Sequence, residues 1–577
     1  MLIKLDRKPR APIAADPSGP ADVLVLGHYD GGFAAHERAL RGRGEMSGDY
    51  RNLRNDFVTL DGERLSYLDV YNRLGGRTLH WTEMLGTAVA VLCSYLARHG
   101  VRAVPGKFCA SERAELDVQL ASGIPVIALT TTLYLDAVIA EQVVGYVRAR
   151  APGACIVMGG PLVENLHHNL AAADLAMVFD DIGADVYVLE RQGEKTLVDV
   201  VRRAVAREPL RGLPNCFVRG PDGAFEYGEA VAENLPLVES AIDWSLFSER
   251  TIGAAVQTRT AFGCPFKCTF CDYPIRAGGK WKSYDMETIE REMMELDARP
   301  GVTDVVFIDD TFNFPIPRFV KILEMMIRRR FSFRWYSYFR CNLATPEIVA
   351  MMRESNCGGV FLGIESGDDS VLDIMQKKAT AAEYGRGIGL LNAAGIPSFA
   401  SLIVGFPGET AETVGNTIRL LNETRPTFFR GEIWYYNQRS PIHNQHAALQ
   451  IEGNGYRFRH STMSWEEACD QAIRLFDEVH GSTWLPMYDV DFWSLPYLRG
   501  VGLSLADIQE FLARCNELLA LELGLARAHR PRAAIEEDLR ALCRRELRPG
   551  RTLPAGVIAP PGLGRAIEID HGREHAR

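Results

Sequence analysis

The feature that most constrains the fold of this 577-residue chain is an alternation of short apolar runs with helical segments, which occurs in two separate stretches. Strands that alternate with helices of about ten to fifteen residues predict βαβ units around a parallel sheet. The first stretch, about 21–205, therefore predicts an α/β domain built on an open sheet. Its strands are expected at 22–27, 101–104, 125–133, 154–158, 175–179 and 186–189, and its helices at 86–99, 111–121, 135–149 and 164–173.

The second stretch, about 255–436, carries six further strand segments with helices between them. Six parallel strands with intervening helices predict a closed or partly closed (β/α) barrel. The strands are expected at 255–259, 304–308, 333–338, 359–363, 398–404 and 429–435, and the helices at 286–298, 316–328, 345–354, 380–394 and 410–423.

The remaining segments complete the predicted domain organisation. Ser464 and Glu467 have the spacing of a capping box, which predicts a helix start in a mainly helical C-terminal part. The predicted division begins with a flexible tail at 1–20, a Rossmann-like domain at 21–205 with an insertion or lid at about 28–85, and a connector at 206–250. A partial barrel at 251–440, a mainly helical domain at 441–547 and a flexible tail at 548–577 follow. The helices of the C-terminal domain are expected at 464–479, 504–527 and 531–545.

Composition fits several folded domains rather than a disordered or fibrous chain. Hydrophobic residues make up 47% and charged residues 24% of the chain, and 64 Lys and Arg against 74 Asp and Glu give a net charge of −10. A generally basic nucleic-acid binder is disfavoured by this balance. We find no apolar run near the ~18 residues of a membrane span and no signal-peptide core, so we expect a cytoplasmic protein with reduced thiols and no membrane partner.

Three of the twelve cysteines lie close together in the sequence. Cys264, Cys268 and Cys271 have the spacing CxxxCxxC and directly follow the first predicted barrel strand. Barrel enzymes place their chemistry at the carboxyl ends of the strands. A structural zinc site needs four protein ligands, and no further Cys or His follows within the next sixty residues. Three thiolates with one vacancy favour a [4Fe-4S] cluster whose fourth iron is open to a small molecule.

At these residues the chain resembles the radical S-adenosylmethionine (SAM) superfamily, whose signature is this cysteine spacing with an aromatic residue before the last cysteine. The resemblance covers about 255–436. It implies that Cys264, Cys268 and Cys271 bind the cluster and act in catalysis. It further implies that the open iron binds the amino and carboxylate groups of SAM, and that the backbone near Phe270 contacts adenine.

Charged residues at the ends of the following predicted strands are weaker matches to the same family. Asp309 and Asp310 follow the second strand, where the family contacts the SAM amino group, and Arg340 and Glu365 close the next two strands. Carboxylates facing an ammonium group and a guanidinium facing a carboxylate suit a zwitterionic ligand. The alternative for each is a helix cap or a surface turn, which is favoured for Glu409 and Thr410 after the fifth strand.

The edge of the first sheet also carries a candidate binding site. The dinucleotide fingerprint GxGxxG is absent after Gly27, which disfavours NAD. The third to fifth predicted strands end in small hydroxyl residues and paired glycines, which allow a nucleotide tail to approach the sheet edge closely. These strand ends are similar to those of the cobalamin-binding domain found in front of many radical SAM enzymes. A histidine ligand to cobalt stays in doubt because Asp-x-His-x-x-Gly is absent, and a sheet used only for packing is the alternative. The candidate cobalamin contacts are Thr130, Thr131, Thr132, Leu133, Gly159, Gly160, Glu190, Gly193 and Glu194.

The order of the two domains resembles cobalamin-dependent radical SAM methyltransferases. That resemblance implies that SAM is cleaved to a 5'-deoxyadenosyl radical and that methylcobalamin delivers a methyl group to an unactivated carbon or a phosphinate phosphorus of a natural-product intermediate. The run 307–315, FIDDTFNFP, looks most like the phosphinate P-methyltransferases of phosphinothricin-type biosynthesis. The alternatives are a rearrangement or oxidation without methyl transfer, and a non-catalytic protein that uses its cluster for structure or redox sensing.

The expected partners are a small-molecule or peptide substrate and a one-electron donor such as flavodoxin or ferredoxin, with no nucleic acid. For the aromatic substrate-contact candidates, packing in the barrel is an equal alternative. For the histidines the alternative is an ordinary surface position. The candidate substrate contacts are Arg340, Trp434, Tyr435, Tyr436, His443 and His460.

Overall fold

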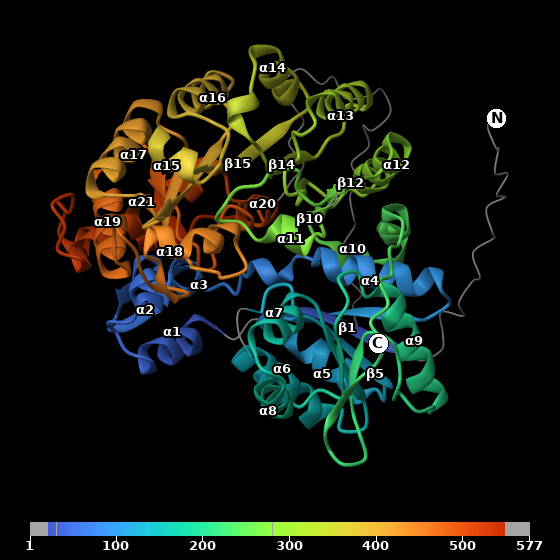
Figure 1. The fold of residues 1–577 in the computed structure, drawn as a ribbon. Coiled ribbons are helices and arrows are strands. Elements are labelled where there is room, and N and C mark those ends of the chain that lie inside the picture. Colours follow the sequence, from blue (N-terminus) through green and yellow to red (C-terminus); the bar gives the residue numbers. More distant parts are fainter. Residues whose placement is uncertain (1–20, 30–31, 135–136, 280, 548–577) are drawn as a thin grey trace, which may run out of the picture.

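The computed structural model describes residues 21–29, 32–134, 137–279 and 281–547. Two seven-stranded sheets with helices around them form the body of the molecule, and the first sheet lies below the second in Figure 1. The predicted α/β fold class is confirmed. Both predicted terminal tails, 1–20 and 548–577, lie outside the described residues.

The first sheet has the strand order β4-β1-β5-β6-β7-β8-β9. Its first five strands are parallel, and β8 and β9 add an antiparallel hairpin built from the predicted connector. The strands are β1 (Val23–Tyr29), β4 (Ala103–Phe108), β5 (Val126–Thr130), β6 (Cys155–Gly159), β7 (Val186–Val188), β8 (Cys216–Arg219) and β9 (Phe225–Tyr227). The helices are α4 (Thr87–Arg98), α5 (Arg113–Ala121), α6 (Ala137–Arg150), α7 (Pro161–Asn169), α8 (Ala172–Ile182) and α9 (Glu194–Ala206).

The strand expected at 175–179 is wrong, because these residues lie within helix α8. Leu175, Phe179 and Ile182 are buried, and their spacing places them on one face of a helix. Residues 175–179 alone form a short apolar run typical of a strand. Together with the alanines before them and Ile182 after them, they show the spacing of a helix.

The second sheet is an open barrel of parallel strands in the order β10-β13-β14-β15-β16-β17-β20. A seventh strand, β20, joins it from the predicted helical domain. The strands are β10 (Ala255–Thr258), β13 (Asp304–Phe307), β14 (Arg334–Tyr338), β15 (Cys357–Glu365), β16 (Ser398–Val404), β17 (Phe428–Ile433) and β20 (Thr483–Trp484). The helices are α10 (Glu249–Ile252), α11 (Tyr273–Arg276), α12 (Met286–Asp297), α13 (Ile316–Arg329), α14 (Pro346–Glu354), α15 (Asp369–Ile374), α16 (Ala381–Ala393) and α17 (Ala411–Thr424).

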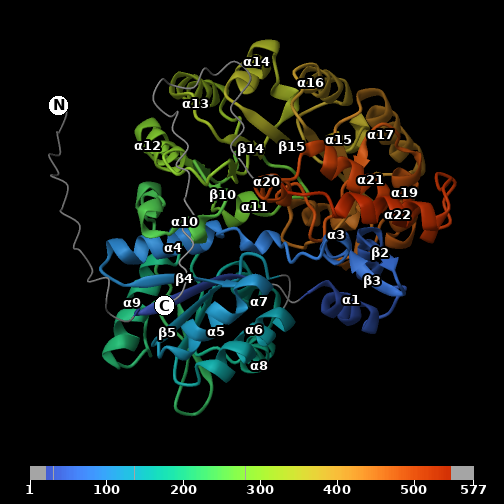
Figure 2. The same cartoon turned by 180° about the vertical axis from the view of Figure 1, so that it is seen from behind.

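The helices and strands of the predicted insertion do not lie over the first sheet as a lid, whereas Trp81 near its end packs against His28 of β1. The elements of the insertion pack beside the C-terminal helices, at the blue and red edge of the molecule in Figure 2. Tyr67 Oη donates to Asn516 Oδ1 at 2.9 Å, and Arg54 forms an ion pair with Glu522 at 2.8 Å. Sequence periodicity shows that these helices have an apolar face but not which surface receives it. The elements are α1 (Phe33–Gly42), α2 (Gly48–Leu53), β2 (Phe57–Leu60), β3 (Glu63–Ser66) and α3 (Tyr67–Gly75), whereas 30–31 lie outside the described residues.

The C-terminal part is mainly helical, as predicted, and the capping box of Ser464 and Glu467 opens α19. No helix in the described ranges is both long and apolar enough to cross a membrane. The elements of this C-terminal part are α18 (His446–Leu449), β18 (Glu452–Asn454), β19 (Arg457–Arg459), α19 (Trp465–Glu478), α20 (Ser494–Gly500), α21 (Leu505–Glu522) and α22 (Arg532–Cys543).

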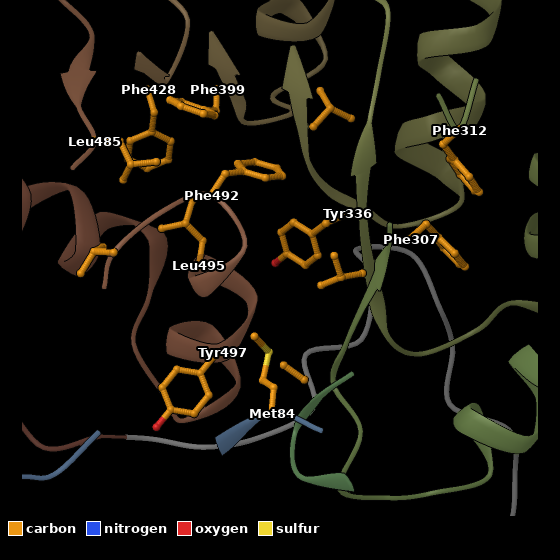
Figure 3. Close-up of a cluster of buried hydrophobic side chains, with 14 of the residues drawn as sticks. Met84, Phe307, Phe312, Tyr336, Phe399, Phe428, Leu485, Phe492, Leu495 and Tyr497 are labelled. Carbon is orange, nitrogen blue, oxygen red and sulfur yellow. The ribbon is translucent and has the colours of Figure 1, made fainter. Parts of the chain in front are cut away.

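Side chains from this C-terminal part fill the inner side of the open barrel. Phe492 lies 6.3 Å from Tyr336 of β14 and 6.0 Å from Phe399 of β16, ring centroid to centroid. On the other side of the sheet Phe307 stacks on Phe312 at 4.6 Å, and Figure 3 shows these two layers. The barrel core is therefore completed by residues that follow the barrel in the sequence.

Candidate functional site

The three clustered cysteines lie on the loop that follows β10 and the short strand β11 (Ala261–Phe262), which pairs with β12 (Lys282–Ser283). Backbone groups of the loop are bound from three directions. Gly263 N donates to Asp310 Oδ2 at 3.0 Å, Thr269 N donates to the carbonyl of Met375 at 2.9 Å, and Ile442 N donates to the carbonyl of Thr269 at 2.8 Å. The barrel strands therefore fix the loop at their carboxyl ends, where it was predicted.

Of the three thiols of this loop, Cys268 is buried and Cys264 and Cys271 are half-buried. Burial raises the pKa of Cys264, and burial with the neighbouring thiols raises the pKa of Cys271 to about 12. Among the described residues no three His, Cys, Asp or Glu side chains converge as ligands of one metal ion. A [4Fe-4S] cluster does not need such convergence, because its cysteines bind different irons. The donor set therefore fits a cluster better than a single ion.

The two aspartates after β13 differ in their surroundings. Both carboxylate oxygens of Asp309 accept hydrogen bonds from Thr260 at 2.5 Å, and Arg318 lies 3.8 Å away. Asp309 thus braces the turn before β11 and is already fully engaged. Burial and the adjacent Asp309 raise the pKa of Asp310 to about 7. Asp310 holds the start of the cysteine loop through Gly263.

Arg340 lies directly against the cysteine loop. Its guanidinium carbon is 3.8 Å from the ring centroid of Phe266, and it donates to the carbonyl of Lys377. The buried Nε of Arg340 has no hydrogen-bond partner among the residues that the structure describes. Because burying an unpaired donor is costly, this atom is a candidate contact for an anionic group of a ligand.

Glu365 ends β15 in a left-handed conformation, with φ of 65°. Its Oε1 lies 2.8 Å from Nζ of Lys377, and that ammonium lies 5.3 Å from the ring centroid of Phe270. A non-glycine residue rarely adopts this backbone, and such positions gather at functional sites. The structure therefore brings Glu365 and Phe270 together through Lys377.

The loop after β16 is held by internal contacts. Glu409 accepts from Gly405 N at 2.5 Å, and burial raises its pKa to about 8, so it holds a proton at neutral pH. His460 Nε2 lies 2.9 Å from the carbonyl of Gly405, and Trp434 packs 5.9 Å from the His460 ring. His460 and Trp434 thus support this loop from behind.

The other candidate substrate contacts are spread over two environments. Tyr435 is 58% exposed, whereas Tyr436 is buried, with its Oη 2.6 Å from His443 Nδ1. His443 lies in the turn whose neighbour Ile442 binds the cysteine loop. Tyr436 and His443 therefore border the loop.

At the carboxyl edge of the first sheet, Thr131 is used internally. Its Oγ1 donates to the carbonyl of Gly159 at 3.0 Å and accepts from Leu162 N at 3.1 Å, which fixes the start of α7. Gly160 has φ of 107°, and a Cβ there would lie 3.0 Å from Thr131 Oγ1, so glycine is required. Thr130 shares a 3.2 Å contact with Thr132, and Thr132 and Leu133 are exposed.

The residues after β7 brace the connector. Glu190 accepts from Glu233 N at 3.4 Å, and Gly193 adopts a left-handed conformation before α9. Glu194 is buried and accepts from Ser240 Oγ at 2.9 Å, and within the described part of the chain its Oε2 has no hydrogen-bond partner. Burial raises the pKa of Glu194, and the guanidinium of Arg259 opposes that rise. Arg259 directly follows β10, so Glu194 faces the barrel.

The carboxyl edges of the two sheets are joined by a contact that the sequence did not predict. Arg439 donates to Glu164 at 2.9 Å and to Asn165 at 3.2 Å, both in α7. Arg276 of α11, just after the cysteine loop, lies 3.8 Å from the same Glu164. Residues distant in sequence make this junction, and no local pattern marks it.

Residues 258–421 match the family model described as the radical SAM superfamily. The chain carries a radical SAM domain. The chain is 29% identical over 160 residues to an uncharacterized methyltransferase of Pyrococcus horikoshii, a match that covers 28% of this chain and 35% of the relative. It is 26% identical over 326 residues to the anaerobic magnesium-protoporphyrin IX monomethyl ester cyclase of Cereibacter sphaeroides, covering 52% and 50%. The chain thus spans half or less of the length of these relatives.

Two structures of the radical SAM methyltransferase TsrM from Kitasatospora setae share the fold. The structure with cobalamin and a [4Fe-4S] cluster aligns with a TM-score of 0.57 and 15% identity over 91% of this chain and 100% of that chain. The structure with tryptophan and a SAM analogue aligns with a TM-score of 0.52 and 16% identity over 78% and 82%. At this identity the matches show the fold. They confirm a Rossmann-like domain followed by a radical SAM partial barrel.

Proposed function

We propose that this chain is a cobalamin-dependent radical SAM methyltransferase that transfers a methyl group from SAM, by way of methylcobalamin, to an unactivated carbon or a phosphinate phosphorus of a small molecule. One observation carries the proposal: Glu164 joins the carboxyl edge of the first sheet to residues beside the cysteine loop. Two cofactors that bind at these two edges would lie on facing sides of this junction, as transfer between them requires.

The residues beside the cysteine loop suit SAM. The unpartnered Nε of Arg340 is a donor for a carboxylate, and Asp310 is a half-buried acid beside the loop. A ligand with an ammonium group would favour the charged form of Asp310, whose pKa burial raises to about 7. Asp309 serves this site indirectly, because its carboxylate is already engaged by Thr260.

The edge of the first sheet suits a flat nucleotide-bearing cofactor such as cobalamin. Gly159 and Gly160 end β6 without side chains, and Thr132 with the 45% exposed Leu133 borders the same edge. Small groups at a sheet edge allow close approach of a ligand. His28 lies at this edge beside Trp81, and burial lowers its pKa to about 4, so its imidazole is neutral.

When bound, the cofactors supply reductive cleavage of SAM and a methyl carrier, which protein side chains do not provide. The chain's own residues bind and orient. Arg340 and Asp310 anchor the two charged ends of SAM, and Lys377 fixes Glu365 beside Phe270. The junction at Glu164 keeps the two edges together.

We also propose the class of the substrate and of the electron donor. The TsrM complex with tryptophan supports a small-molecule acceptor, and a peptide is a further candidate. A one-electron donor of the flavodoxin or ferredoxin type would reduce the cluster. An oxygen-sensitive cluster requires a reducing compartment, which supports a cytoplasmic location.

The similarity to a cyclase favours one second candidate, a cobalamin-dependent rearrangement or oxidation without methyl transfer. Product analysis separates the two. After anaerobic reconstitution with iron, sulfide, cobalamin and SAM, methyl transfer gives an acceptor heavier by one methylene unit together with S-adenosylhomocysteine and 5'-deoxyadenosine. A panel of phosphinate, amino-acid and peptide acceptors identifies the substrate class, and 5'-deoxyadenosine without S-adenosylhomocysteine would reject methyl transfer.

The cluster assignment has its own test. Cys268→Ala should reduce bound iron and abolish SAM cleavage, because it removes one of three ligands. Cys469→Ala is a matched control, since Cys469 is a buried thiol on α19 and lies outside the loop. Equal iron content and SAM cleavage in the Cys268 variant and the wild type would contradict an enzyme of this kind.

A further inference from the structure

Thr311 places a hydroxyl group beside one sulfur of the cysteine loop. It follows Asp310 at the end of β13 and is 6% exposed. Its Oγ1 lies 3.5 Å from Cys264 Sγ and donates a hydrogen bond to the carbonyl oxygen of Asp310 at 2.7 Å. This hydroxyl therefore has two neighbours and a single hydrogen to share between them.

The protonation state of the sulfur decides how that hydrogen is used. A free Cys264 thiol can donate to Thr311 Oγ1 while Thr311 donates onward to the Asp310 carbonyl. A sulfur that binds iron has lost its proton and accepts only. In the loaded protein the Thr311 hydroxyl is therefore the group of this pair that can donate, and its single hydrogen can turn from the Asp310 carbonyl to Cys264 Sγ.

We propose that Thr311 is a positioning residue that donates a hydrogen bond to Cys264 Sγ in the cluster-loaded protein and thereby raises the reduction potential of the cluster. The inference rests on the proposed function, because it requires the cluster to be present. Hydrogen bonds to the sulfurs of an iron–sulfur cluster help set its potential, since they stabilise the more negative, reduced state. Reduction adds one electron from the donor protein, and the hydrogen bond itself moves no atom.

The surroundings of Thr311 fix its direction. Asp310 on one side is bound to Gly263 N at 3.0 Å. Phe312 on the other side stacks on Phe307, and Asn313 Oδ1 accepts from Arg340 N at 3.0 Å. Because the chain is held on both sides, the Thr311 oxygen stays beside the sulfur, and only its hydrogen has to turn.

A backbone donor also serves this sulfur. Cys264 accepts from the backbone of Phe266, and Cys271 accepts from the backbone of Tyr273. Backbone donors persist when a side chain is exchanged. The hydroxyl of Thr311 is the contribution at Cys264 that a substitution can remove while the loop keeps its backbone contacts.

The test is a redox titration of the reconstituted full chain, with the paramagnetic signal of the reduced cluster as readout. Thr311→Val keeps the shape of the side chain and removes the hydroxyl, so we expect a more negative potential. Thr311→Ser keeps the hydroxyl and should restore the wild-type potential. Thr269→Val is the matched control. Thr269 lies in the cysteine loop, but its hydroxyl donates to the carbonyl of Ile374 and not to a cysteine sulfur.

The outcomes separate the inference from the function on which it rests. A wild-type potential in T311V with full iron content overturns the inference and leaves the proposed function standing. An equal shift in T311V and T269V also overturns it, because loop disturbance would then explain the effect. Should T311V fail to fold, Thr311→Ala lacks the hydroxyl without added bulk and gives the same reading. A wild-type chain that takes up no iron overturns the proposed function itself.

Discussion

Arg430 is a buried cation that ties the insertion to the barrel, and its removal is the sharpest stability test of the fold. Its side chain is 0% exposed and lies 2.6 Å from Asp56, which is 4% exposed in the insertion. It also lies 2.6 Å from Glu432 and stacks on Trp484, with its guanidinium carbon 4.5 Å from the ring centroid. Arg430→Met keeps much of the apolar stem and removes the charge.

The expected loss follows from what the substitution leaves behind. Asp56 would stay buried without the cation that now neutralises it, and removing one partner of a buried ion pair costs about 3–5 kcal/mol. The double variant R430M/D56N removes both charges, so it should recover part of this loss. The exposed pair Arg250–Glu115, at 2.9 Å with side chains 69% and 48% exposed, is the matched control. Arg250→Met should cost at most about 1 kcal/mol.

Urea unfolding followed by tryptophan fluorescence measures these differences, because Trp484 lies against the substituted side chain. The free energy of unfolding should fall strongly in R430M and little in R250M. This stabilising role of Arg430 would be refuted by an R430M variant whose free energy of unfolding is within about 1 kcal/mol of the wild type. It would equally be refuted by a double variant less stable than R430M, because the buried unpaired carboxylate would then not be the cause.

Two further predictions concern single side chains. Burial raises the pKa of Glu292 from 4.5 to about 7, so the folded chain keeps a proton that the unfolded chain loses. The free energy of unfolding should therefore fall by about 3 kcal/mol as pH rises across this window, and E292Q should remove that slope in urea unfolding between about pH 5 and about pH 8. Gly387→Ala places a Cβ 2.2 Å from the Cys341 carbonyl and should cost about 1–3 kcal/mol in thermal or urea unfolding. Gly389→Ala in the same helix meets no atom within 4 Å and should stabilise by about 0.5–1 kcal/mol, so equal effects of the two would contradict the packing.

The cysteine loop and most of the elements around it were predictable from local patterns. The spacing of Cys264, Cys268 and Cys271 after an apolar run places them at a strand end, and the structure has them there. The error at 175–179 arose where helix and strand patterns overlap over five residues, which periodicity resolves poorly. Strand β20 was missed because two residues, Thr483 and Trp484, carry no strand pattern.

The roles of individual site residues were less predictable. Asp309 and Asp310 are adjacent in sequence, yet one is engaged by Thr260 and the other binds Gly263 at the start of the cysteine loop. His460 was a candidate substrate contact and supports the carbonyl of Gly405. Adjacent side chains at a strand end meet different neighbours, and those neighbours come from other strands.

Local patterns are enough to predict the α/β class, the cysteine loop after the first barrel strand and the helix start at Ser464, because each depends on residues a few positions apart. The packing of the insertion, the contact of Glu164 between the two sheets and the position of Thr311 beside Cys264 are seen only in the folded chain. These contacts join residues tens to hundreds of positions apart. These contacts depend on which surfaces are buried together in the folded chain, and a local sequence pattern does not contain that information.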